Sequence, residues 1–87
     1  MNTIEQMHKS LSALCPAALE VFDDSAKHAG HAGARDGGGH YRVSIVASCF
    51  AGLPTMKRHR LVYDALGPLM KREIHALSIS AKTPQEP

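Results

Sequence analysis

The 87-residue sequence contains no tryptophan, and aromatic residues make up only 5% of it. A hydrophobic core must therefore be filled mainly by aliphatic side chains. No run of about 18 apolar residues is present to span a membrane. A formal net charge of +2 requires neither a nucleic acid nor a membrane as partner. The N-terminal stretch MNTIEQMHKS lacks the features of a signal peptide. We expect a single cytoplasmic domain spanning residues 1–87 that does not bind membranes.

Cysteine is equally scarce. Cys15 and Cys49 are the only two, and neither belongs to a CxxC pair, which excludes a zinc ribbon and a thioredoxin-type site. In a reducing compartment both are expected to be free thiols. We interpret Cys49, at the end of the stretch HYRVSIVAS and away from the Gly-rich segment, as a small buried side chain. No Ser-His-Asp set, Cys-His pair or phosphate-binding loop is indicated either, so we expect a protein that is not an enzyme.

The first half of the chain predicts one helix and two strands. Apolar spacing indicates a helix over about residues 3–14, with a capping box formed by Thr3 and Gln6. Cys15-Pro16 ends it, because proline disfavours helical geometry in the preceding residue. The stretches ALEVFDDS and HYRVSIVAS then alternate with the period of half-buried strands. They are expected to pair as an antiparallel hairpin.

The second half predicts helix, short helix and strand. From Thr55 the apolar residues follow a helical period, and Gly67-Pro68 separates a second short helical segment. HALSISA then alternates as a third strand, with Leu77 and Ile79 facing inward and parallel to the second strand. The ordered core is expected at about residues 3–82, with a flexible Gly-rich loop at 29–39 and a frayed tail at 83–87. The order αββααβ indicates a two-layer α+β domain, with helices on one face of a three-stranded mixed sheet.

Four stretches together resemble the BolA-like protein family: LEVFDDSAKHAGH, HYRVSIVASCFAGL, KRHRLVYDAL and IHALSISAKTP. The resemblance covers about residues 11–84. It implies a fold similar to class II KH domains. It also implies binding to a monothiol glutaredoxin with its glutathione, and a [2Fe-2S] cluster shared with that partner and absent when the protein is alone. The implied roles are iron homeostasis and cluster delivery; the implied alternative is a DNA-binding transcription regulator of stress response and cell morphology. We expect a monomer when no partner is present.

Histidines concentrate in HAGHAGARDGGGH, residues 28–40, and imidazole is a known ligand of iron–sulfur clusters. A hairpin places this loop at the sheet end where the third strand begins, so His28, His31 and His75 are expected to converge. We also expect His75 to start on the inward face, in phase with Leu77. The resemblance places His75 and His28 at the family's ligand positions. His31 is an extra histidine three residues from His28, and two possibilities stay open for it: it substitutes for His28 or it points elsewhere. An intrinsic zinc site and simple solvated histidines are the alternatives; the role of His40 is left open.

The residues Lys57, Arg58, His59 and Arg60 form a basic cluster at the start of the main helix. Cations there oppose the helix dipole, which favours a role in binding an anion. Three interpretations stay open: a solvated helical face, a docking surface for the glutaredoxin, or weak to moderate DNA binding. The GLPT segment does not supply the GXXG loop of RNA-binding KH domains.

Overall fold

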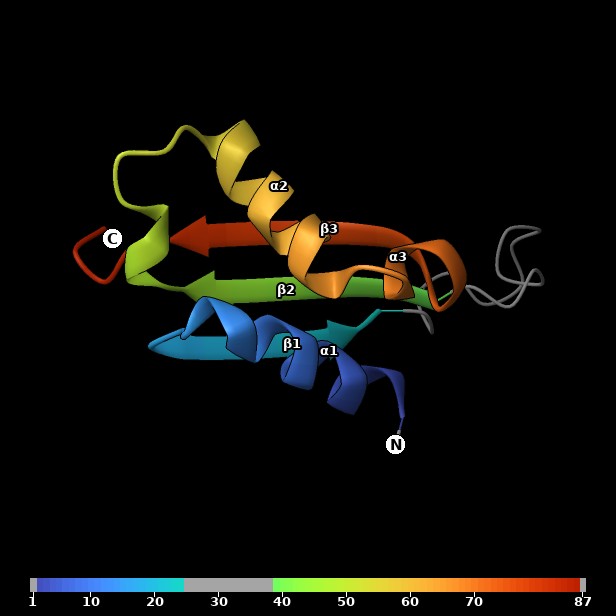
Figure 1. Ribbon diagram of the computed structural model, residues 1–87. Coiled ribbons are helices and arrows are strands. Elements are labelled where there is room, and N and C mark those ends of the chain that lie inside the picture. The colour runs from blue at the N-terminus through green and yellow to red at the C-terminus, as the bar shows by residue number, and fades with distance from the viewer. Residues whose placement is uncertain (1, 25–38, 87) are drawn as a thin grey trace.

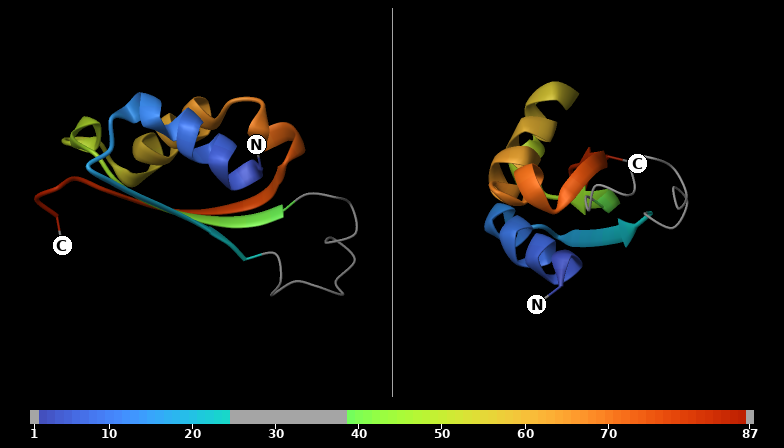
Figure 2. Two further views of the ribbon diagram at one scale, coloured as in Figure 1. Left: turned by 90° about the horizontal axis from the view of Figure 1, so that it is seen from below. Right: turned by 90° about the vertical axis from the view of Figure 1, so that its right-hand side faces the viewer.

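The computed structural model describes residues 2–24 and 39–86. Within these residues, helices lie on one face of a three-stranded sheet and leave the other face uncovered (Figures 1 and 2). This confirms the predicted two-layer α+β architecture. The elements, in order, are α1 (Thr3–Leu11), η1 (Ser12–Leu14), β1 (Ala18–Asp23), β2 (Gly39–Val46), η4 (Ser48–Phe50), α2 (Thr55–Leu66), α3 (Leu69–Arg72) and β3 (Ile74–Lys82).

The sheet has the strand order β1-β2-β3. β1 pairs with β2 antiparallel, with Val21 opposite Val43, and β3 pairs with β2 parallel, with Ile79 opposite Val43. Both predicted pairings are confirmed. Because β2 and β3 run in the same direction, the start of β3 lies at the sheet end where β1 finishes and β2 begins.

The core lies between this sheet and the helices. Val43 and Ile45 of β2 are fully buried in one cluster with Val62 and Leu66 of α2, and both buried faces are those that the two periodicities predicted. Phe50, the largest buried side chain, comes from η4 rather than from a strand or a long helix. Aliphatic residues supply nearly all of the rest. Among the described residues, the buried hydrophobic ones are Met7, Leu11, Val43, Ile45, Ala47, Phe50, Val62, Leu66 and Ile74.

The N-cap of the first helix lies one residue earlier than predicted. Asn2 is the N-cap, and its side-chain oxygen accepts a hydrogen bond from the backbone N–H of Glu5 at 2.9 Å. Thr3 is therefore the first helical residue, and the predicted capping box is wrong. An asparagine is at least as good a cap as a threonine, so the cap shifts without cost. The helix then tightens at Ser12 into η1 before Cys15 and Pro16.

The expected frayed tail is wrong for residues 83–86. Thr83 is buried, and its backbone N–H donates to Glu86 Oε1 at 2.8 Å. Glu86 is also held by Arg58 of α2 through two further hydrogen bonds. The polar composition of the tail suggested solvation, but the burial of Thr83 and the bonds of Glu86 to Arg58 and Thr83 hold it in place.

Candidate functional site

Three strand ends meet at one end of the sheet. The backbone N–H of Asp24 donates to the carbonyl oxygen of His40 at 2.7 Å, and that of Gly39 donates to Glu73 at 3.0 Å. These bonds fix both ends of the connection between β1 and β2 beside the start of β3. His28 and His31 belong to that connection, which lies outside the described residues, as does most of the expected Gly-rich loop. Their predicted convergence with His75 stays a prediction.

His75 lies at this same sheet end but does not face the core. Gly39 pairs with Ile74 and His40 pairs with Ala76, so one extra residue, His75, is inserted on β3. Ile74 takes the buried position and His75 is exposed. The expectation that His75 starts on the inward face is therefore wrong. A β-bulge interrupts the two-residue alternation of a strand, so its inserted residue does not point to the face that the alternation predicts.

His40 lies directly beside His75. Their ring centroids are 5.3 Å apart and the ring planes are tilted by 46°. His40 occupies the second position of β2, where the register shift falls, so the bulge brings the two imidazoles together. The sequence leaves the role of His40 open, although its position at the start of β2 already indicates the sheet end at which His75 lies. The exposed imidazole of His75 thus has a second imidazole as its neighbour.

Among the described residues, this sheet end offers imidazole donors but no thiol. Among residues 2–24 and 39–86, no group of three His, Cys, Asp or Glu side chains is placed to hold a metal ion. The thiols are elsewhere: Cys49 lies in η4, beyond the far end of β2, and is exposed. Its predicted burial is wrong, because the chain leaves the sheet at Ala47 and turns through η4. Two neighbouring imidazoles are compatible with ligation but do not form a complete ligand set.

Comparison with known proteins identifies the family of this chain. The sequence model described as "BolA-like protein" matches residues 11–86. The chain belongs to the BolA-like family. SufE-like protein 1 from Arabidopsis thaliana is 46% identical over 99% of the chain, which corresponds to 24% of that protein. BolA-like protein 1 from Mus musculus is 43% identical over 85% of the chain and 52% of that protein. The solved structure of BolA1 from Arabidopsis thaliana superimposes with a TM-score of 0.83 and 37% identity, covering 100% of the chain and 99% of that structure.

The BolA-like region accounts for only part of several relatives. The chain spans about a quarter of SufE-like protein 1 and about half of the mouse protein. In the part of the chain that the structure describes, no helix is long and apolar enough to cross a membrane.

Arg58 is set apart from the other members of the predicted basic cluster. Lys57 and Arg60 are exposed, but Arg58 is largely buried and bonded within the chain. It donates to the carbonyl oxygens of Leu53 at 2.8 Å and Ala81 at 3.1 Å, and forms a paired contact with the Glu86 carboxylate at 2.6 and 2.8 Å.

The contact between Arg58 and Glu86 perturbs both groups. Hydrogen bonds from Arg58, joined by the backbone N–H of Thr83, lower the pKa of Glu86 from 4.5 to about 2. The same side-chain hydrogen bond raises the pKa of Arg58 above its ordinary value. The charge of Arg58 is therefore matched by a carboxylate of the same chain. Of the cluster, only Lys57, Arg60 and the half-buried His59 are left to face a partner.

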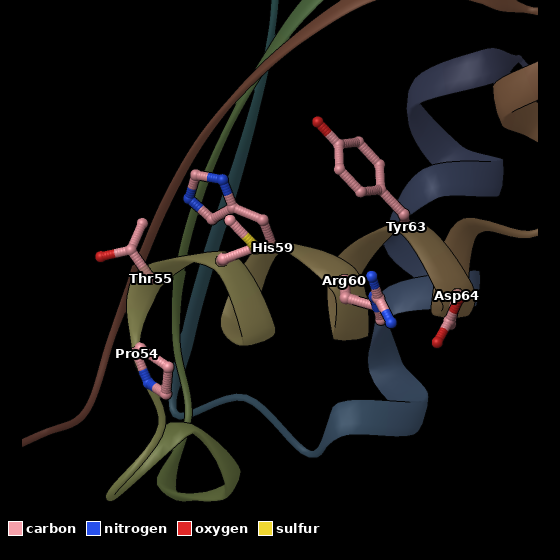
Figure 3. Close-up of a pocket in the computed structure, with 7 residues that line it drawn as sticks. Pro54, Thr55, His59, Arg60, Tyr63 and Asp64 are labelled. Carbon is pink, nitrogen blue, oxygen red and sulfur yellow. The ribbon is translucent and has the colours of Figure 1, made fainter.

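The outer face of α2 carries a shallow groove with a volume of about 1140 Å³. Met56 and Tyr63 are 76% and 41% exposed, the largest apolar side chains left uncovered among the described residues. Figure 3 shows His59 and Tyr63 projecting to one side of the helix and Arg60 and Asp64 to the other. The lining comes from α2 and the residue before it: Pro54, Thr55, Met56, His59, Arg60, Tyr63 and Asp64. Neither His40 nor His75 contributes to this groove, so the two features are separate.

Proposed function

We propose that this BolA-like protein is a non-enzymatic accessory protein of iron–sulfur metabolism. It binds a monothiol glutaredoxin and contributes His75 to a [2Fe-2S] cluster held jointly with that partner. The proposal rests on one observation above all: His75 is exposed on a bulge at the sheet end, beside the ring of His40 and next to both anchored ends of the connection that carries His28 and His31. The likeness to SufE-like protein 1 also supports a role in iron–sulfur metabolism.

The geometry suits a shared rather than a resident cluster. A [2Fe-2S] cluster is held by a full set of thiolate or imidazole ligands, and the cluster itself supplies electron storage and an iron–sulfur unit for transfer. The described residues offer an imidazole pair and no thiol at this end. A partner with glutathione would supply the thiolate ligands. The ring of His40 restricts the orientations open to His75 and so acts as a positioning residue.

The test is an anaerobic titration of a cluster-loaded monothiol glutaredoxin, followed by visible circular dichroism. We expect the wild-type protein to change the cluster spectrum up to a one-to-one ratio and His75→Ala to leave it unchanged. His8→Ala is the matched control, because His8 is an exposed histidine on α1 and lies outside the bulge of β3. It should behave as wild type.

Other outcomes of this titration would distinguish the cluster function from DNA binding. If wild type leaves the spectrum unaltered, the cluster proposal fails. If His75→Ala changes the spectrum as wild type does, His75 is not a ligand. In the first case DNA binding would be measured next, by fluorescence anisotropy at several salt concentrations. With Arg58 already paired to Glu86, we expect that binding to be weak and strongly salt-dependent.

A further inference from the structure

Two thiols lie at the sheet end away from His75. Cys15 is in the short connection between η1 and β1, and Cys49 is in η4, just after β2. Both are exposed free thiols. The backbone N–H of Ala17 donates to the carbonyl oxygen of Val46 at 2.7 Å, which ties the two connections together. Figure 1 and the left view of Figure 2 place η4 and the turn into β1 at this same end.

The thiol of Cys49 reaches the residue next to Cys15. Its Sγ lies 3.8 Å from the carbonyl oxygen of Leu14, the residue that precedes Cys15 in the chain. Planar peptide geometry holds a carbonyl oxygen about 2.8 Å from the following Cα. Sγ of Cys49 is therefore within about 6.6 Å of the Cα of Cys15 by that geometry. Because Sγ is about 2.8 Å from its own Cα, the Cα atoms of Cys15 and Cys49 lie at most about 9.4 Å apart. Disulfides join Cα atoms about 4.4–6.8 Å apart, so side-chain rotation and an approach of these two surface turns by up to about 2.6 Å bring the sulfurs into bonding range.

The backbone at Cys15 is unusual. Its φ of 52° and ψ of 54° are left-handed, and it is the one non-glycine residue with positive φ among the described residues. This position ends η1, where glycine or asparagine is the favoured residue. The turn alone therefore does not explain a cysteine here. Its backbone N–H donates to the carbonyl oxygen of Ser12 at 3.0 Å, which fixes the position of Cys15 in the turn.

We propose that Cys15 and Cys49 form a reversible intramolecular disulfide by exchange with a low-molecular-weight disulfide such as glutathione disulfide. The thiolate of one cysteine attacks a sulfur of glutathione disulfide, and one glutathione leaves as its thiolate and takes up the released proton. The second cysteine thiolate then attacks the protein-bound sulfur, forms the Cys15–Cys49 bond and releases the second glutathione. The protein loses two protons and two electrons, and one glutathione disulfide becomes two glutathione molecules. Glutathione reverses both steps.

The experiment equilibrates the full chain in buffers of graded glutathione and glutathione disulfide, alkylates the free thiols and measures intact mass. We expect the oxidised protein to lose two hydrogens without retaining glutathione. Trypsin, without reductant, should then give a linked pair made of residues 10–27 and 43–57, each of which contains one cysteine. The equilibrium constant for closing the disulfide should be about tenfold or more higher in the folded protein than in guanidinium, because the fold holds the thiols together.

The variants Cys15→Ser and Cys49→Ser provide matched controls. Each retains one exposed thiol, so each should keep one glutathione as a mixed disulfide instead of losing two hydrogens. The proposal is overturned if wild type accumulates a glutathione on both cysteines, if the linked peptides join two different chains, or if folding leaves the closing constant unchanged. Because the thiols lie at the sheet end opposite His75, none of these outcomes depends on the proposed cluster function.

Discussion

Replacing Gly39 with alanine should destabilise the protein through a clash with Tyr41. An added Cβ would lie 2.7 Å from Cζ and Oη of the Tyr41 ring, whereas carbon atoms in contact are normally about 3.5–4.0 Å apart. Overpacking of this kind costs about 1–3 kcal/mol. The alanine also restricts the unfolded chain, which offsets about 0.4–1 kcal/mol. Tyr41 is half-buried and its ring can yield toward solvent, so we expect a net loss of about 1 kcal/mol.

A double-mutant cycle with Tyr41→Ala isolates the clash. Free energies of unfolding from urea titrations would be compared for wild type, both single variants and the double variant. Without the ring, Gly39→Ala should be neutral or stabilise the protein by up to about 1 kcal/mol, which gives a coupling energy of about 1.5 kcal/mol. A Gly39→Ala protein that is as stable as wild type, with no coupling to Tyr41, would refute the reasoning. That result would mean that the Tyr41 ring moves away from the added Cβ without loss of stability.

Two further predictions concern the tail and the two faces of α2. Because its pKa is lowered from 4.5 to about 2, ionised Glu86 stabilises the fold above about pH 4.5, and this contribution is lost as the pH falls toward 2. The difference in unfolding free energy between wild type and Glu86→Gln, measured by urea titration, should therefore be largest at neutral pH and disappear near pH 2. A difference that does not change with pH would contradict the pairing with Arg58. Leu66→Ala should cost about 2–5 kcal/mol because Leu66 is 1% exposed, whereas Met56→Ala, 76% exposed, should change stability by no more than about 0.5 kcal/mol. Equal losses would mean that the assignment of inner and outer faces is wrong.

The architecture could be predicted because several local signals agree. The helical stripe through Val62 and Leu66 and the alternation through Val43 and Ile45 each identify one buried face, and both faces are buried as expected. Gly67-Pro68 marks the end of α2, and the parallel pairing of β2 with β3 follows from the helical crossover between them. Periodicity reports which residues share a face, and that information is sufficient to build the layers.

The site could be predicted less well, because its details depend on contacts between distant segments. The bulge that turns His75 outward exists only through the shifted pairing of Gly39 and His40 with β3, and no local pattern in HALSISA records it. Arg58 is indistinguishable from its basic neighbours in sequence, yet the carbonyl of Ala81 and the carboxylate of Glu86 remove it from the surface. Both differences from the sequence pattern have one cause. A residue's type and spacing define what it can bind, but pairing partners far along the chain decide whether it is still available to a second molecule.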